Sequence, residues 1–337
     1  MKALILEAPQ RARVTEAPEP SSQPGEALVR VLAAGICGTD RHAYAGEHPV
    51  FSYPRIPGHE FAGHVVAAPA DSGVNPGDLV VGDPAVSCGE CYPCRQGRYN
   101  CCVNVSVMGV HRDGALAELV ALPAANLHRV PSGISAQDAV LAEPVAIGLQ
   151  AIHRGRLQRG ESVAILGAGP IGLSALQVAK AMGARTFVTE LRDDRMDFAR
   201  RFGADAVVHA DTAPGAAAEF THGDGFPLVI EAAGEPRAVG EALELVAAAG
   251  RVILLGLIRE PIPIAPWTLI QRELDLLGSR MTTGAIPEAL HMIADGAVQP
   301  QPMVTHHFPL DRADDALELA ARAPNGVEKV IVVMPGG

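Results

Sequence analysis

The stretch ESVAILGAGPIGLSALQVAK, residues 161–180, decides the fold of the second half of the chain. An apolar run leads into the spacing Gly-x-Gly-x-x-Gly, which comprises Gly167, Ala168, Gly169, Pro170, Ile171 and Gly172. Gly167 permits a tight turn, Gly169 lets the backbone approach a pyrophosphate, and Gly172 lets a helix pack against the strand. A glycine turn without a ligand is the alternative. Because the motif follows a strand and opens a helix, it predicts a dinucleotide site at the amino end of that helix.

Short apolar runs and amphipathic segments alternate around this motif. Strands are predicted over 162–166, 186–190, 206–208, 228–231 and 251–255, and helices over 170–182, 194–202 and 238–247. Strands and helices that alternate with short connections predict a parallel sheet with helices on its faces. Beyond residue 287 the sequence predicts a helix, a proline-rich loop at 300–309, a helix over 314–323 and a strand over 329–334.

The first 145 residues follow a different pattern. Strands are predicted over 2–7, 27–34, 61–67, 79–81 and 116–122, separated by glycine and proline turns. This half therefore resembles a β-rich barrel or sandwich. The predicted fold class is α/β, with a β-rich domain and a doubly wound parallel-sheet domain.

Size and composition limit the possible functions. The chain has 337 residues, of which 48% are hydrophobic and 19% charged, and 27 Lys and Arg against 38 Asp and Glu give a net charge of −11. This composition is typical of a soluble globular protein, and the negative charge disfavours a nucleic-acid partner. The amino-terminal apolar run is too short for a signal peptide, and glycines with Pro170 interrupt the apolar stretch 163–179. We therefore expect a cytoplasmic protein without a membrane partner.

Glu190 ends the strand that follows the glycine motif, 21 residues after Gly169. A carboxylate at this place accepts hydrogen bonds from the adenosine ribose and repels a 2′-phosphate, which favours NAD over NADP. Arg192 and Arg195 argue for NADP, because a guanidinium beside the ribose pairs with such a phosphate. NAD is the predicted cofactor, and Arg195 is retained as a candidate cofactor-binding residue.

Five of the six cysteines lie within residues 88–102. Cys88, Cys91, Cys94 and Cys102 have a spacing that suits the closed tetrahedral sulfur site of structural zinc. Cys101 precedes Cys102 directly, so spacing alone leaves the fourth ligand open. A thiol cluster without metal is the alternative.

A second set of candidate ligands is spread along the first half of the chain: Cys37, His59, Glu60 and Glu143. A thiolate, an imidazole and one or two carboxylates make a catalytic zinc site that leaves a position for water or substrate. Taken singly, each has an ordinary structural explanation: a core cysteine, a structural histidine, or an acid at the start of a helix.

Five motifs in this order resemble the zinc-dependent medium-chain alcohol dehydrogenases. They are Cys37-Gly-Thr-Asp-Arg-His42, Gly58-His-Glu60, the four-cysteine segment, Glu143-Pro144 and the glycine motif. Within this family the chain looks most like the polyol branch, with sorbitol, galactitol, L-threonine and L-galactonate or L-gulonate 5-dehydrogenases. The resemblance implies a GroES-like catalytic domain over 1–145 and 286–337, a Rossmann domain over 146–285, and a homodimer or homotetramer.

The resemblance also implies roles for individual residues. Cys37, His59 and Glu60 would hold the catalytic zinc, with Glu143 a fourth ligand or a partner of the zinc-bound water. Thr39 would take the proton of the substrate hydroxyl and His42 would pass it to solvent. With the structural site, two zinc ions per chain are expected. Candidate substrate contacts are Phe51, His111 and Arg280.

The sequence therefore predicts an enzyme that oxidises a secondary hydroxyl of a polyol or sugar acid to a ketone and transfers the hydride to NAD. L-threonine or another alcohol is the alternative substrate. A regulatory protein that only senses the dinucleotide is the alternative of another class, and it predicts a damaged catalytic set.

Overall fold

The computed structural model describes residues 1–336, which form two compact units. The first unit contains residues 1–143, 282–296 and 300–336, and the second contains residues 144–281 and 297–299. The predicted boundaries at 145 and 285 differ from these by two and four residues, and the short segment 297–299, predicted in the first domain, lies in the second unit. It belongs with the second unit because the backbone N–H of Gln299 donates to Oε1 of Gln177 at 2.9 Å.

The first unit is built around a seven-stranded sheet with the strand order β16-β17-β3-β4-β5-β9, in which β8 also pairs with β3. Its strands are β1 (Lys2–Ala8), β2 (Arg11–Glu16), β3 (Glu26–Ile36), β4 (Glu60–Ala67), β5 (Leu79–Gly82), β6 (Ala85–Val86), β7 (Ser106–Val107), β8 (Leu119–Pro123), β9 (Leu127–Arg129), β16 (Val304–Pro309) and β17 (Lys329–Val333). Its helices are α1 (Gly38–Ala45), α2 (Tyr92–Arg95), α3 (Ala136–Ala139), α10 (Ile286–Ala294) and α11 (Ala313–Arg322), with short turns η1 (Tyr99–Cys101), η2 (Ala124–Asn126), η4 (Gln301–Met303) and η5 (Leu310–Arg312).

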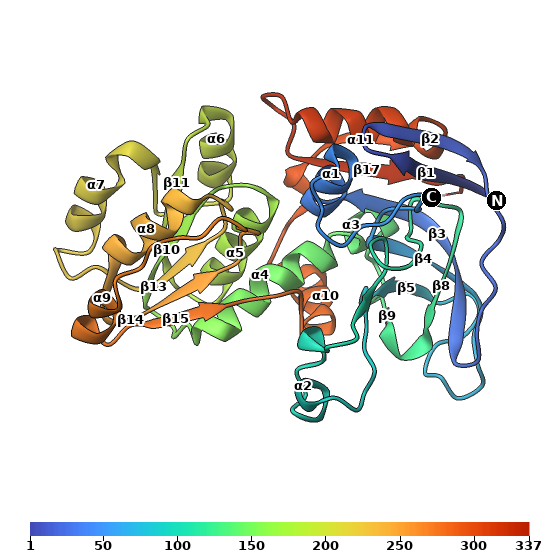
Figure 1. Ribbon diagram of the computed structural model, residues 1–337, viewed down its shortest axis with the longest axis horizontal. Helices are drawn as coiled ribbons and strands as arrows, with labels where there is room; N and C mark the ends of the chain where they lie inside the picture. The colour runs from blue at the N-terminus through green and yellow to red at the C-terminus, as the bar shows by residue number, and fades with distance from the viewer. Residues whose placement is uncertain (337) are drawn as a thin grey trace. The chain divides into compact units, whose positions relative to one another are not determined.

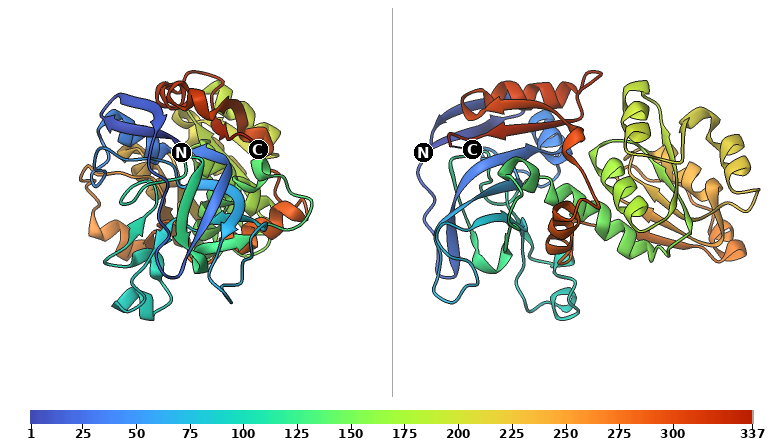
Figure 2. Two further views of the ribbon diagram at one scale, coloured as in Figure 1. Left: turned by 90° about the vertical axis from the view of Figure 1, so that its right-hand side faces the viewer. Right: turned by 180° about the vertical axis from the view of Figure 1, so that it is seen from behind.

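Distant parts of the sequence meet in this sheet. Strand β17, near the carboxyl end of the chain, pairs antiparallel with β3 from the first forty residues. Helix α11 packs on β17 and on β2, as both views of the unit show (Figures 1 and 2). Phe61, Leu116, Leu122 and Leu317 contribute to one buried core that both parts of the chain share.

The predicted proline-rich loop at 300–309 is partly wrong, because β16 occupies its second half. β16 is the edge strand of the sheet and pairs parallel with β17. Pro309 is its last residue, and an edge strand tolerates a missing N–H donor at its end. The apolar pattern of this edge strand is too weak for sequence analysis to find it.

The second unit contains a six-stranded parallel sheet with the order β12-β11-β10-β13-β14-β15. Its strands are β10 (Ser162–Leu166), β11 (Arg185–Glu190), β12 (Ala206–His209), β13 (Phe226–Glu231), β14 (Val246–Leu254) and β15 (Asp275–Gly278). Its helices are α4 (Ala142–Gly155, which begins in the first unit), α5 (Pro170–Ala181), α6 (Asp193–Arg201), α7 (Ala213–Phe220), α8 (Pro236–Leu245) and α9 (Pro266–Arg272), with the turn η3 (Ala210–Thr212). Helices α5 and α6 pack on β10, β11 and β12, and α8 packs on β13 and β14 (Figure 1).

This strand order has a reversal between β10 and β13, where successive strands continue in opposite directions across the sheet. In open parallel sheets, ligands bind outside the carboxyl ends of the strands at such a reversal. The helix predicted to reach residue 247 ends at Leu245. Helix α7, which is alanine-rich and lacks clear apolar periodicity, was not predicted, and neither were α9 and β15.

Candidate functional site

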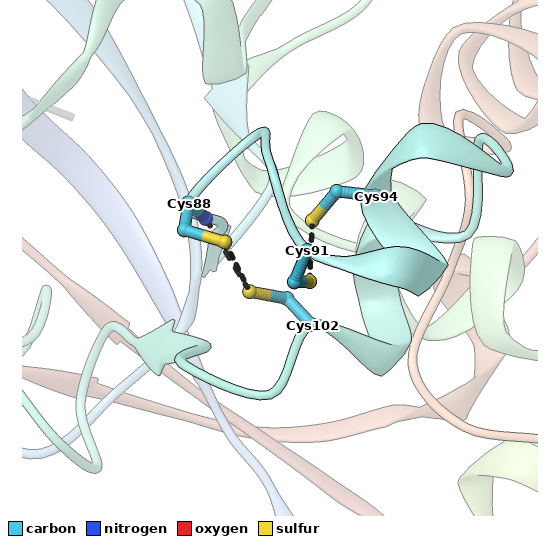
Figure 3. Close-up of side chains that lie close together, drawn as sticks. All are labelled: Cys88, Cys91, Cys94 and Cys102. Carbon is cyan, nitrogen blue, oxygen red and sulfur yellow. Dashed lines mark hydrogen bonds between the residues drawn. The ribbon is translucent and has the colours of Figure 1, made fainter.

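Four cysteine side chains converge in a short lobe of the first unit (Figure 3). We call Cys88, Cys91, Cys94 and Cys102 the cysteine lobe. Their sulfur atoms all lie within 4.8 Å of one another, with Cys91 and Cys94 separated by 3.3 Å and Cys88 and Cys102 by 3.5 Å. The sulfurs of a tetrahedral zinc site are roughly 3.8 Å apart, so this lobe has the dimensions of such a site.

Backbone N–H groups donate to sulfur atoms of the cysteine lobe. The N–H groups of Cys88 and Asn104 each donate to Sγ of Cys102 at 3.3 Å. Backbone N–H groups of Val103 and Cys94 lower the pKa of Cys91 to about 6, whereas burial raises the pKa of Cys94 to about 11. The thiolate is the form that binds a metal.

Cys101 is outside this sulfur group. Its Sγ lies 3.9 Å from Nη2 of Arg98 instead. The geometry thus gathers Cys102, and not its neighbour, with the other three sulfurs. This is the choice that spacing alone left open.

A tyrosine between the ligands fixes the lobe to the rest of the unit. The hydroxyl of Tyr99 donates to Oδ2 of the buried Asp83 at 2.7 Å and accepts from the N–H of Gly284 at 2.6 Å. Burial raises the pKa of Asp83, while the Tyr99 hydroxyl and the N–H of Ala85 oppose the rise. Neither Tyr99 nor Asp83 was predicted.

The second group, which we call the buried centre, consists of Cys37, His59 and Glu60. One ligand atom from each lies within 4.8 Å of the other two. Cys37 follows β3 and caps α1, while Glu60 begins β4, and these strands pair so that Glu60 lies opposite Gly35. Antiparallel pairing of β3 and β4 therefore brings the three residues together.

Asp40 is a functional residue that sequence analysis missed. Its carboxylate, 1% exposed, accepts from the N–H of Cys37 and from the N–H of Gly58, both at 2.9 Å. It also lies 4.0 Å from Nδ1 of His59. Asp40 thus holds the two ligand-bearing loops together. Its position three residues after Cys37, typical of a capping box, is a signal that could have found it.

Lys329 was also missed, because it lies almost at the other end of the chain. Its side chain is 2% exposed, forms an ion pair with Glu60 and donates to the carbonyl of Ile36 at 3.2 Å. A Cβ atom at Gly35 would lie 2.0 Å from Oε2 of Glu60 and 3.2 Å from Cε of Lys329. A side chain at position 35 would therefore displace the Glu60 carboxylate from this arrangement.

The charge of the buried centre fits a divalent cation. Cys37, Asp40 and Glu60 are acidic groups, and Lys329 forms an ion pair with one of them, Glu60. Within residues 1–336, Oε1 of Glu60 and Nδ1 of His59 find no hydrogen-bond partner. Burial lowers the pKa of His59, but Cys37, Asp40 and Glu143 outweigh it and raise the pKa well above the ordinary value. Buried charges require compensation, and zinc accepts this mixture of sulfur, nitrogen and oxygen ligands.

Glu143 lies beside the buried centre rather than in it. It is a buried residue in the first turn of α4, and its carboxylate is not in the group whose ligand atoms all lie within 4.8 Å. Burial and the neighbouring Glu60 raise its pKa to about 7, against the opposing effect of His59 and Lys329. The structure thus makes Glu143 a neighbour of the centre.

Thr39 and His42, the predicted proton relay, both lie on α1, directly after Cys37. Thr39 is half-buried and His42 is exposed. Nδ1 of His42 lies 3.2 Å from Oε2 of Glu47, a partner that was not predicted. The order from buried to exposed suits a path for a proton towards solvent.

The glycine motif takes the shape that a dinucleotide loop requires. Gly167 has φ of +99°, its N–H donates to Thr189, and α5 begins at Pro170. The carboxylate of Glu190 accepts from the N–H of Ala168 at 2.9 Å. It accepts as well from the N–H groups of Leu191 and Arg192, at 2.7 and 3.1 Å. Glu190 is therefore fixed directly beside the glycine loop.

The guanidinium of Arg192 is paired with the carboxylate of Asp194. Its Nε and Nη2 donate to the two carboxylate oxygens of Asp194 at 3.0 and 2.6 Å. Arg195 lies in α6, in the same segment.

The candidate substrate contacts lie in different places. Phe51 is half-buried in an aromatic group, with its ring centroid 5.0 Å from that of Tyr53. His111 is exposed, and its Nδ1 accepts from the N–H of Val107 at 3.1 Å. Arg280 is exposed and follows β15 in the second unit.

Comparison with known families gives two matches. Residues 23–132 match the alcohol dehydrogenase GroES-like domain, and residues 170–295 match the zinc-binding dehydrogenase domain. Between them they contain most of the residues described above. No helix within residues 1–336 is long and apolar enough to cross a membrane.

Curated relatives include several dehydrogenases. The L-galactonate-5-dehydrogenase of Escherichia coli K12 is 35% identical over 322 residues, 92% of each chain. The L-threonine 3-dehydrogenase of Pyrococcus horikoshii is 35% identical over 334 residues, 96% of this chain and 95% of the relative. The sorbitol dehydrogenase of Bacillus subtilis 168 is 32% identical over 341 residues, 98% and 97% of the two chains.

Two solved structures carry a dinucleotide. The short chain alcohol dehydrogenase RspB of E. coli CFT073 in complex with NADH is 33% identical, with a TM-score of 0.92 over 99% of both chains. A protein from Sinorhizobium meliloti 1021 bound to NADP is 34% identical, with a TM-score of 0.91 over 98% of both chains. These matches confirm the predicted α/β fold class, with its GroES-like and Rossmann domains.

Proposed function

Because the chain belongs to the zinc-dependent alcohol dehydrogenase family, we propose that it oxidises a secondary hydroxyl of a polyol or sugar acid to a ketone, with NAD as the hydride acceptor. The buried centre carries this proposal. A thiol, an imidazole and a carboxylate converge there, and the two residues of the proposed proton relay, Thr39 and His42, follow Cys37 on α1. The sensor alternative is not favoured, because this set is intact and the relatives include named dehydrogenases.

Cys37, His59 and Glu60 are the residues that would hold a catalytic zinc, and the cysteine lobe would hold a structural one. A bound zinc lowers the pKa of a coordinated hydroxyl towards neutrality, which favours loss of hydride from the adjacent carbon. Two zinc ions per chain are proposed on this basis. Asp40 orients the ligand loops through its bonds to Cys37 and Gly58.

The remaining steps are proton transfers by side chains of α1. Thr39 is two residues from Cys37 and takes the hydroxyl proton of the substrate. His42 is exposed and paired with Glu47, so it passes that proton to solvent. Glu143, which burial holds at a pKa of about 7, assists as a partner of water at the centre.

NAD is the proposed cofactor because of two contacts near the glycine motif. Glu190 places a carboxylate beside the glycine loop, where it would repel a 2′-phosphate. Arg192 is paired in bidentate fashion with Asp194, so its guanidinium is already neutralised. Arg195 of α6 is a further cation in this segment that favours NADP, so both dinucleotides belong in the test.

The proposed substrate class rests on the relatives that act on sorbitol and L-galactonate. Arg280 would suit the carboxylate of a sugar acid, and Phe51 and His111 are the other proposed contacts. L-threonine is the alternative, supported by the relative from P. horikoshii.

We also propose a homodimer or homotetramer. Trp267 and Ile270 of α9 are each at least 66% exposed, which is unusual for large apolar side chains. Light scattering at working concentration tests this directly, and a monomer would contradict it.

The test of function is the initial rate of NAD⁺ and NADP⁺ reduction with hexitols, hexonates, L-threonine and simple alcohols. We expect chelator-sensitive turnover of a hexitol or hexonate with NAD⁺. Turnover of L-threonine instead would replace the proposed substrate, and dinucleotide binding without turnover of any substrate would favour the sensor.

A further inference from the structure

We infer that Glu231 is a positioning residue of the dinucleotide site, because its carboxylate ties together the loops that follow β13 and β14. This inference rests on the proposed function, since it assumes that a nicotinamide dinucleotide binds at this edge of the sheet. Sequence analysis did not single out Glu231, which is simply the last residue of a buried strand.

Backbone N–H groups of both loops donate to the carboxylate of Glu231. Oε1 accepts from the N–H groups of Ala233 and Gly234 at 2.9 and 2.7 Å, and Oε2 accepts from the N–H of Gly256 at 3.1 Å. The side chain has no exposed surface. Ala233 and Gly234 belong to the loop after β13, and Gly256 to the loop after β14. One buried side chain thus fixes both loops.

The loop after β13 is in close contact with the glycine motif, and the two loops are in close contact with each other. The N–H of Ala232 donates to the carbonyl of Leu166 at 2.9 Å, and a Cβ atom at Gly167 would lie 2.9 Å from the backbone of Ala233. A Cβ atom at Gly256 would lie only 2.3 Å from Cα of Gly234. A shift of either loop would therefore be transmitted to the turn that approaches the pyrophosphate.

The position of Glu231 in the sheet gives these contacts a function. Strands β10 and β13 flank the reversal of strand order, where a ligand binds outside the carboxyl ends of the strands. Loops fixed by a buried carboxylate are already in place before the dinucleotide arrives, so less ordering free energy is lost on binding.

The experiment compares NADH affinity of the full-length wild type with two variants at this position, measured by NADH fluorescence. Glu231→Gln keeps the shape of the side chain but presents an amide N–H to at least one of these backbone donors. We expect its Kd for NADH to rise about 10-fold, in the range of a lost hydrogen bond to a charged group. Glu231→Ala should raise Kd further, and Tm is measured for each variant.

The matched control is Asp205→Asn in the same sheet. The Asp205 carboxylate also accepts from a backbone N–H, that of Thr186 at 2.7 Å, but near the amino end of β11. It should alter Tm without changing the Kd for NADH. In turnover, Glu231→Gln should raise KM for NAD⁺ more than it lowers kcat.

Two results overturn the inference alone: a folded Glu231→Gln that binds NADH as tightly as the wild type, or an Asp205→Asn that weakens binding equally. A wild type that binds neither NADH nor NADPH overturns the proposed function, and this inference with it.

Discussion

The cysteine lobe and the buried centre both gather zinc-binding groups, but they are held in opposite ways. The lobe takes its four sulfurs from residues 88–102, in a partly exposed segment whose own backbone N–H groups stabilise the thiolate of Cys91. The centre takes its ligands from positions 37, 59 and 60 and depends on two further buried side chains, Asp40 and the distant Lys329. The lobe is thus a local structure and the centre a product of the whole sheet.

This difference predicts that the cysteine lobe serves stability and the buried centre serves catalysis. A closed four-sulfur site contributes folding free energy and leaves no position for a substrate. A centre of three ligands with a neighbouring carboxylate leaves a position open, and Thr39 and His42 lead away from it. Substitutions in the two clusters should therefore give different phenotypes.

The largest effect is expected from Cys37→Ser. Loss of a ligand of the catalytic metal should lower kcat/KM at least about 1,000-fold, because a metal supplies several kcal/mol of charge stabilisation. The Tm should change little. Cys101→Ser is the control, since Cys101 lies outside both clusters. Unchanged kcat/KM in Cys37→Ser would contradict a catalytic role for the buried centre.

Cys91→Ser should act on stability instead. We expect Tm to fall by about 10 °C, because the metal in a closed sulfur site contributes folding free energy. Differential scanning calorimetry of Cys91→Ser and Cys101→Ser distinguishes a true ligand from a nearby thiol. Equal losses of Tm in the two variants would contradict the assignment of Cys91 as a ligand and Cys101 as a nearby thiol.

Lys329→Met tests whether the buried pair supports the centre. Removing one partner leaves Glu60 uncompensated, which should cost about 3 kcal/mol of unfolding free energy in the zinc-free protein. Bound zinc should reduce this cost by compensating Glu60. Lys180→Met, which breaks the partly exposed pair with Asp205, should cost less than about 1 kcal/mol. Denaturant titrations with and without zinc measure both, and a cost independent of zinc would argue against Glu60 as a ligand.

Tyr99→Phe is the smallest of these changes. It removes the hydroxyl that joins Asp83 to Gly284 and should lower the unfolding free energy by about 1–2 kcal/mol. Tyr92→Phe is the matched control, because Tyr92 is 70% exposed in the same lobe. Hydrogen exchange of residues 282–286 should rise in Tyr99→Phe only. Equal exchange in both variants would show that the lobe is not anchored there.

The same contrast explains what the sequence could predict. The cysteine segment and the glycine motif are local, so spacing and flanking strand indicated their chemistry directly. Asp40 was hidden because its role depends on Gly58, eighteen positions away, and Lys329 because only the pairing of β17 with β3 brings it to Glu60. Edge strand β16 was missed for a related reason: its stability comes from its partner strand and not from its own pattern.

The most direct test of the two-site account is zinc content per chain, measured by mass spectrometry on folded wild type and Cys37→Ser. The account predicts about two zinc ions per chain in the wild type and about one in Cys37→Ser, with the cysteine lobe still loaded. One zinc ion in both proteins, or two in both, would contradict it.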